Sequence, residues 1–126
     1  MQNFAAGLQE LGVTKHDKVA LFSENSSRWL VADSAIMACG AAGVVRGASA
    51  PPEELLYIAQ HSSATVLVVQ DGAALSKLLA ASLAHEQAQV GDDNGRSEGE
   101  HIPSRVAMSG GAGQIWERKK CGLLPW

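Results

Sequence analysis

Apolar residues recur along the first 85 positions with spacings that alternate between those of helices and strands. Phe4, Leu8 and Leu11 lie at helical spacing, and the run Lys18–Phe22 is short, apolar and rich in strand-forming residues. The later segments continue the alternation. In chain order they predict a helix over 29–42, a strand over 44–45, a helix over 50–61, a strand over 65–69 and a helix over 75–83.

Strands that are separated by helices favour parallel pairing with right-handed crossovers. In the run 65–69, the four consecutive residues after Thr65 are apolar, which is typical of a strand covered on both faces. We therefore expect an α/β fold, a partial parallel three-stranded sheet with flanking helices, in which 18–22 and 65–69 are interior strands. The centre of the core is expected to hold Leu21, Ile36, Leu67 and Val69.

The composition changes near residue 90. Residues 91–113 are crowded with Gly, Ser, Asp and Glu, and burial there cannot offset the entropy of ordering the chain. We therefore expect residues 1–85 to form a partial α/β unit and residues 86–126 to form a disordered, low-complexity tail. The glycine-rich run 109–113 lacks the preceding strand and the following Lys-Ser or Lys-Thr of a phosphate-binding loop, so it is interpreted as linker.

Charge and cysteine content exclude several functional classes. The 126 residues include 10 basic and 13 acidic side chains, a net charge of −3, which argues against binding to nucleic acid. Cys39 and Cys121 are too few for a disulfide scaffold or a four-cysteine zinc site. The apolar stretch 29–45 contains Asp33 and is short for a bilayer, so no membrane span is expected.

Polar residues follow the first two predicted strands, where open α/β sheets bind ligands. Residues 23–27 could contact an anion at a helix N-terminus, or Asn25 or Ser26 could cap that helix, which is the interpretation we favour. Arg46 could meet an anionic ligand. It could equally lie in solvent in a turn whose bend Gly47 permits.

The histidines and the basic residues near the end of the chain give no site. Histidine occurs at four separated positions, none of them with metal-binding spacing: His16, His61, His85 and His101. The basic run 118–120 is interpreted as solvated rather than as a patch for an acidic partner. No catalytic, cofactor-binding or metal-binding residue is predicted.

Several runs, in this order and spacing, resemble the start of the AMP-binding domain of adenylate-forming acyl-activating enzymes. They are 4–8, 11–13, 17–22, Asn25, Trp29, 41–45, 53–55, 61–64 and 66–69. The amino-acid sequences of 28–33 and 44–47 are most similar to those of plant and algal plastid long-chain acyl-acyl-carrier-protein synthetases. The resemblance covers residues 3–79.

The resemblance implies the chemistry of the whole family. Its members join a fatty acid to AMP from ATP, release pyrophosphate and pass the acyl group to a thiol of acyl carrier protein or coenzyme A, with Mg²⁺ balancing the triphosphate. A whole protein of this kind is expected in the chloroplast. The chain as written begins with no visible transit peptide, so we expect it in the cytoplasm if it is made in this form.

The chain also departs from the family. The Ser/Thr/Gly-rich phosphate loop ending in Pro-Lys-Gly, the Tyr-Gly-x-Thr-Glu motif and the lysine of the C-terminal domain are absent, and after Leu83 the chain resembles nothing in the family. No cofactor is therefore expected to bind this chain. We expect a truncated N-terminal fragment of a long-chain fatty acid–[acyl-carrier-protein] ligase, inactive alone and prone to self-association through exposed sheet edges. The alternative is a free-standing small α/β binding or interaction module without catalysis.

Overall fold

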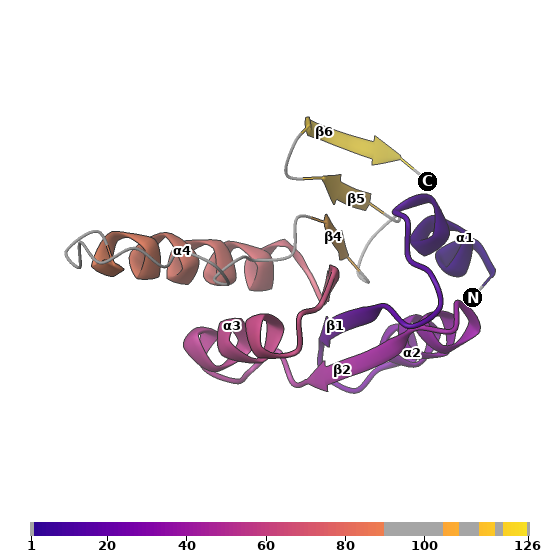
Figure 1. Cartoon of the computed structure of the whole chain (residues 1–126), viewed down its shortest axis with the longest axis horizontal. Helices are drawn as coiled ribbons and strands as arrows, with labels where there is room; N and C mark the ends of the chain where they lie inside the picture. The colour runs from indigo at the N-terminus through magenta and orange to yellow at the C-terminus, as the bar shows by residue number, and fades with distance from the viewer. Residues whose placement is uncertain (1, 90–104, 109–113, 118–119, 126) are drawn as a thin grey trace.

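The computed structural model describes residues 2–89, 105–108, 114–117 and 120–125 (Figure 1). Helices and strands alternate through the first 89 residues, as the sequence pattern predicts. The helices are α1 (Gln2–Glu10), α2 (Ser27–Ala38), α3 (Pro52–His61) and α4 (Gly72–Gln89). The strands are β1 (Lys18–Phe22), β2 (Ala42–Arg46), β3 (Val66–Val69), β4 (Arg105–Met108), β5 (Gln114–Glu117) and β6 (Lys120–Pro125).

The described strands form one sheet in the order β2-β1-β3-β4-β5-β6. The three predicted strands pair in parallel, with Ala20 of β1 aligned with Val44 of β2 on one side and Leu67 of β3 on the other. The parallel α/β arrangement and the interior positions of β1 and β3 are therefore confirmed. β4 pairs in parallel with β3, whereas β5 and β6 are antiparallel, so one edge of the predicted three-stranded sheet is covered.

The three added strands lie within residues 86–126, which the sequence analysis expects to form a disordered, low-complexity tail. The described parts of that region pair with the sheet, and the expectation of disorder stays a prediction. Residues 90–104, 109–113 and 118–119 lie outside the described residues, and the predicted boundary at residue 85 stays a prediction.

Helices cover both faces of the sheet, which makes a three-layer arrangement (Figure 1). Leu21 and Ile36 are fully buried in the layer between the sheet and helices α1 and α2. Leu67 and Val69 are buried in the opposite layer, beneath α3 and α4. All four predicted core residues are thus buried. Leu21 is aligned with Val68, so it faces the opposite way from Leu67 and Val69, because side chains alternate between the two faces along a strand.

The second helix is displaced from its predicted range of 29–42. It begins at Ser27 and ends at Ala38, and Gly40 has a φ of +74°, a left-handed conformation that stops the helix and turns the chain into β2. The strand predicted over 44–45 is correspondingly longer, because β2 begins at Ala42.

The last helix, α4, has 18 residues and extends beyond the predicted range of 75–83 at both ends. Leu75 and Leu78 face the core, whereas Leu79 and Leu83 are exposed. Within the part of the chain that the structure describes, neither α4 nor any other helix combines the length and the hydrophobicity needed to cross a bilayer.

Candidate functional site

The carboxyl ends of β1, β2 and β3 meet at one edge of the sheet, and polar residues gather there. The Ser23 backbone N–H donates to the Arg46 carbonyl at 3.2 Å, which extends the pairing of β1 and β2 by one residue. On the other side, the Glu24 backbone N–H donates to Gln70 Oε1 at 3.0 Å. These bonds tie the three segments that leave the sheet to one another.

The carboxylate of Glu24 anchors the loop between β2 and α3. The Ser49 backbone N–H donates to Glu24 Oε1 at 2.8 Å, and this bond is the main reason that the pKa of Glu24 lies below its ordinary value of 4.5. A Cβ on Gly47 would lie 3.2 Å from the same oxygen. Gly47 begins the turn, since its carbonyl accepts from the Ala50 N–H at 3.2 Å, and it does so without a positive φ. The absence of a side chain at Gly47 lets Glu24 approach the loop.

The Glu24 anchor is expected to make stability depend on pH. The pKa of Glu24 is lower in the folded protein than its value of 4.5 in the unfolded chain. The bond to Glu24 therefore stabilises the fold fully above pH 4.5, and this stabilisation is lost as the pH falls through the pKa of Glu24 in the folded protein. The Glu24→Gln variant should therefore have a lower urea midpoint than wild type at pH 7, and the difference should shrink below pH 4.5. An equal difference in urea midpoint between wild type and Glu24→Gln at pH 7 and at pH 3 would contradict this role of the Glu24 carboxylate.

The serines of 23–27 serve the local backbone. Ser26 is the N-cap of α2, and its hydroxyl oxygen accepts from the Trp29 backbone N–H at 3.1 Å. The Ser23 hydroxyl donates to the Glu24 carbonyl at 3.0 Å. Helix capping, the interpretation that the sequence analysis favours for this run, is confirmed at Ser26.

Arg46 is turned toward the start of α3. Its Nε lies 2.8 Å from Glu54 Oε1, and both side chains are partly in solvent, with exposed fractions of 49% and 40%. An ion pair this exposed contributes roughly 0.2–1 kcal/mol. The arginine thus has an acidic partner within the protein, which favours a solvated position in the turn over a role in binding an anionic ligand.

The described histidines and acids do not gather into a metal site. His61 ends α3 and stacks on Tyr57, with ring centroids 5.4 Å apart. No group of three or more His, Cys, Asp and Glu side chains that could hold a metal ion occurs among residues with described side chains. The side chain of His85, and all of His101 and the run 109–113, lie outside the described structure.

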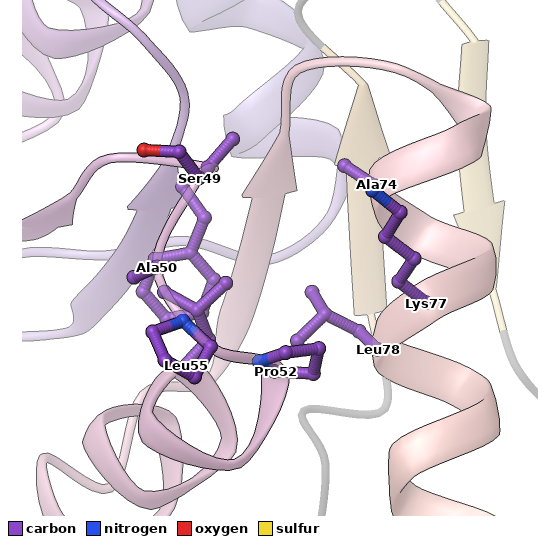
Figure 2. Close-up of a pocket in the computed structure, with 10 residues that line it drawn as sticks. Ser49, Ala50, Pro52, Leu55, Ala74, Lys77 and Leu78 are labelled. Carbon is purple, nitrogen blue, oxygen red and sulfur yellow. The ribbon is translucent and has the colours of Figure 1, made fainter.

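A pocket lies beside this edge of the sheet, between the loop that enters α3 and the first turns of α4 (Figure 2). Its volume is about 200 Å³. Its lining comprises Phe22, Ala48, Ser49, Ala50, Pro51, Pro52, Leu55, Ala74, Lys77 and Leu78. Sequence reasoning missed this pocket because the run 50–54 was interpreted only as a helix start, and no local pattern shows that α4 packs opposite it.

Comparison with known proteins identifies the family to which this chain is similar. The AMP-binding enzyme family matches residues 1–113. The chain is 52% identical over 69 residues to the chloroplastic long-chain-fatty-acid–[acyl-carrier-protein] ligase AEE15 of Arabidopsis thaliana, which covers 55% of the chain and 10% of that protein. It is 36% identical over 66 residues to the long-chain-fatty-acid–CoA ligase FadD15 of Mycobacterium tuberculosis, or 52% of the chain and 11% of the relative.

The fold also matches a solved structure. The N-terminal domain of FACL13 from Mycobacterium tuberculosis superposes with a TM-score of 0.62 at 20% identity, covering 86% of this chain and 23% of that one. The family match runs past Leu79, where the resemblance noted in the sequence ends. The view that the chain resembles nothing in the family after Leu83 is therefore wrong as far as residue 113. Since the match covers most of its length, this chain belongs to the AMP-binding enzyme family.

Proposed function

We propose that this chain is an N-terminal portion of an ATP-dependent long-chain fatty acid ligase that loads acyl carrier protein, and that it is inactive by itself. One observation carries the proposal. Over 69 residues the chain is 52% identical to a protein named as such a ligase, yet this match covers only 10% of that protein. The fold of the described residues, a parallel sheet with helices on both faces, is compatible with this position in a larger domain.

The side chains at the sheet edge support the second half of the proposal. Acyl adenylation needs several donors aimed at a triphosphate and at the reacting phosphorus, because positioning and electrostatic stabilisation supply most of the rate. Arg46 is paired with Glu54, and Glu24 places a carboxylate at this edge. The family's phosphate loop and Tyr-Gly-x-Thr-Glu motif do not occur in the sequence. On this proposal, the described edge lacks the set of donors that adenylation needs.

The whole protein would then use ATP and Mg²⁺, a long-chain fatty acid, and the thiol of acyl carrier protein as acceptor. Coenzyme A is the other acceptor to test, since FadD15 is named as a CoA ligase. The plastid is the proposed location of the whole protein, as the Arabidopsis relative is named chloroplastic.

Self-association belongs to the same proposal. β2 is the first strand of the sheet, and its outer edge has no partner strand among the described strands. Val45 on this strand is largely exposed. An unpaired parallel edge with exposed apolar side chains can pair with another chain. In a longer protein, further residues could cover the same edge.

Transcript sequencing tests the proposal. A transcript from this locus should continue, in frame downstream of the family-matched residues 1–113, into sequence that encodes the Ser/Thr/Gly-rich loop and the Tyr-Gly-x-Thr-Glu motif. The protein made from it should release pyrophosphate from ATP only when a long-chain fatty acid is present. Abundant protein of this length, with no such continuation in the genomic DNA, would favour a free-standing binding module instead.

A further inference from the structure

Ser49 is an exposed serine in the loop between β2 and α3, and a basic residue stands at a defined distance before it. Among all the serines and threonines of the sequence, Ser49 alone has an arginine, Arg46, three residues before it. Protein kinases that select basic substrates read a charge pattern of this kind, because acidic side chains of the kinase contact the arginine. The pattern therefore singles out Ser49 as an acceptor of phosphate from such a kinase.

The arginine and the serine are both accessible in the fold. The Arg46 side chain is 49% exposed, and its ion pair with Glu54 contributes little to stability, so its transfer to acidic groups of a kinase costs little. After Ser49 the chain is extended. Pro51 has a φ of −54° and a ψ of 137°, and it restricts the preceding Ala50 to extended conformations. Extended segments are a form in which chains bind to the groove of a partner protein.

The contact between Ser49 and Glu24 holds this loop in place. The Ser49 backbone N–H donates to Glu24 Oε1 at 2.8 Å, and the Ser49 hydroxyl, which points away from α4, is a second donor that lowers the pKa of Glu24 (Figure 2). The Glu24 N–H donates in turn to Gln70, so the contact joins the loop to the ends of β1 and β3. The loop residues 48–52 form one wall of the pocket, and Glu24 therefore positions that wall.

We propose that a protein kinase selective for basic substrates phosphorylates Ser49, and that the phosphate releases the loop from Glu24 and displaces one wall of the pocket. In the transfer, Ser49 Oγ bonds to the γ-phosphorus of ATP, the bond from that phosphorus to the β,γ-bridging oxygen breaks, ADP leaves, and the hydroxyl proton passes to an aspartate of the kinase.

The phosphate acts through charge. The Ser49 hydroxyl is lost as a donor, and a group with a charge of about −1.5 to −2 then lies beside the Glu24 carboxylate. Repulsion between the two anions opposes the 2.8 Å bond from the Ser49 N–H, so the loop separates from Glu24. The inference does not depend on the proposed ligase function.

Mass spectrometry of the 126-residue chain, after incubation with cAMP-dependent protein kinase, ATP and Mg²⁺, tests the modification. We expect one phosphate per chain, on Ser49, and none in Ser49→Ala. Arg46→Met should lower the initial rate about tenfold or more, since it removes the charged group that the kinase contacts. Arg28→Met is the matched control. It removes an exposed arginine of α2 and should leave the rate unchanged.

Urea unfolding and amide hydrogen exchange of the phosphorylated chain test the release of the loop. The phosphate should lower the urea midpoint at pH 7 by about 0.5–2 M. In Glu24→Gln, whose neutral amide does not repel the phosphate, the decrease should be about half as large or less. The Ser49 amide should exchange faster after phosphorylation, whereas the Trp29 amide, bonded to Ser26, should not change.

Three results would overturn the proposal. The first is phosphate that is absent from Ser49 or lies mainly on another residue. The second is a urea midpoint that rises on phosphorylation, as expected if the phosphate drew Arg46 away from Glu54 and tightened the loop. The third is an equal effect of the phosphate in wild type and in Glu24→Gln, a comparison that holds even if phosphorylation unfolds the wild-type chain.

Discussion

The Leu67→Asp variant is expected to lose cooperative unfolding altogether. Leu67 is 2% exposed and lies in β3, between β1 and β4. Its side chain belongs to the cluster that packs α3 and α4 on the sheet. An aspartate there would bury a carboxylate without a cationic partner, a penalty of at least several kcal/mol. Because small domains have only about 5–15 kcal/mol of stability, we expect the folded state to be lost.

Circular dichroism during heating measures this effect. Wild type should show a sigmoidal transition, and Leu67→Asp should show a gradual change without one. Leu30→Asp is the matched control, since Leu30 is 59% exposed on α2 and its substitution should change the free energy of unfolding by only about 0.5 kcal/mol. A sharp transition for Leu67→Asp at the wild-type temperature would show that β3 is not the centre of the fold.

The parallel core of the fold could be predicted because its signals are local. The runs 19–22 and 66–69 are apolar at consecutive positions, which is typical of strands covered on both faces. Segments with apolar residues at helical spacing lie between them in the sequence. The strands β4, β5 and β6 carry no comparable signal. Each has four to six residues, and their pairing depends on the open edge of β3, which composition does not reveal.

Element boundaries were less predictable where apolar residues run on without a break. From Ala35 to Val45 the sequence contains only apolar residues and glycine, so spacing alone does not show where the helix ends and the strand begins. The left-handed Gly40 sets that boundary in the structure. In the sequence, a glycine within a run of small residues is compatible with a helix that ends there and with one that continues.

The contacts at the sheet edge could be predicted only where the two partners are close in the sequence. Ser26 caps α2 by bonding to Trp29, only three residues further along the chain, so a local sequence motif can predict this contact. Glu24 bonds to Gln70 and to Ser49, which are 46 and 25 residues away. The pocket likewise depends on the packing of α4 opposite the start of α3. Contacts of this kind follow from the tertiary structure, and no local pattern encodes them.

The largest expected functional effect is the absence of adenylation by this chain. In the transition state, negative charge lies on the oxygens around the transferring phosphorus and on the leaving group, and removing even one preorganised donor typically costs about 10²–10³-fold in rate. At the described sheet edge the arginine is paired with Glu54, and Glu24 and Asp71 add carboxylates. The missing phosphate loop and lysine would remove several donors together. We therefore expect no turnover rather than a reduced one.

Pyrophosphate release by the purified 126-residue chain, incubated with ATP, Mg²⁺ and palmitate, tests the central claim most directly. The proposed role as an incomplete, inactive portion of a ligase predicts release equal to that of a protein-free blank. Leu67→Asp serves as the unfolded control, so that a contaminating activity can be recognised. Release that rises with protein concentration, requires palmitate and disappears in Leu67→Asp would contradict the claim that this chain cannot catalyse alone.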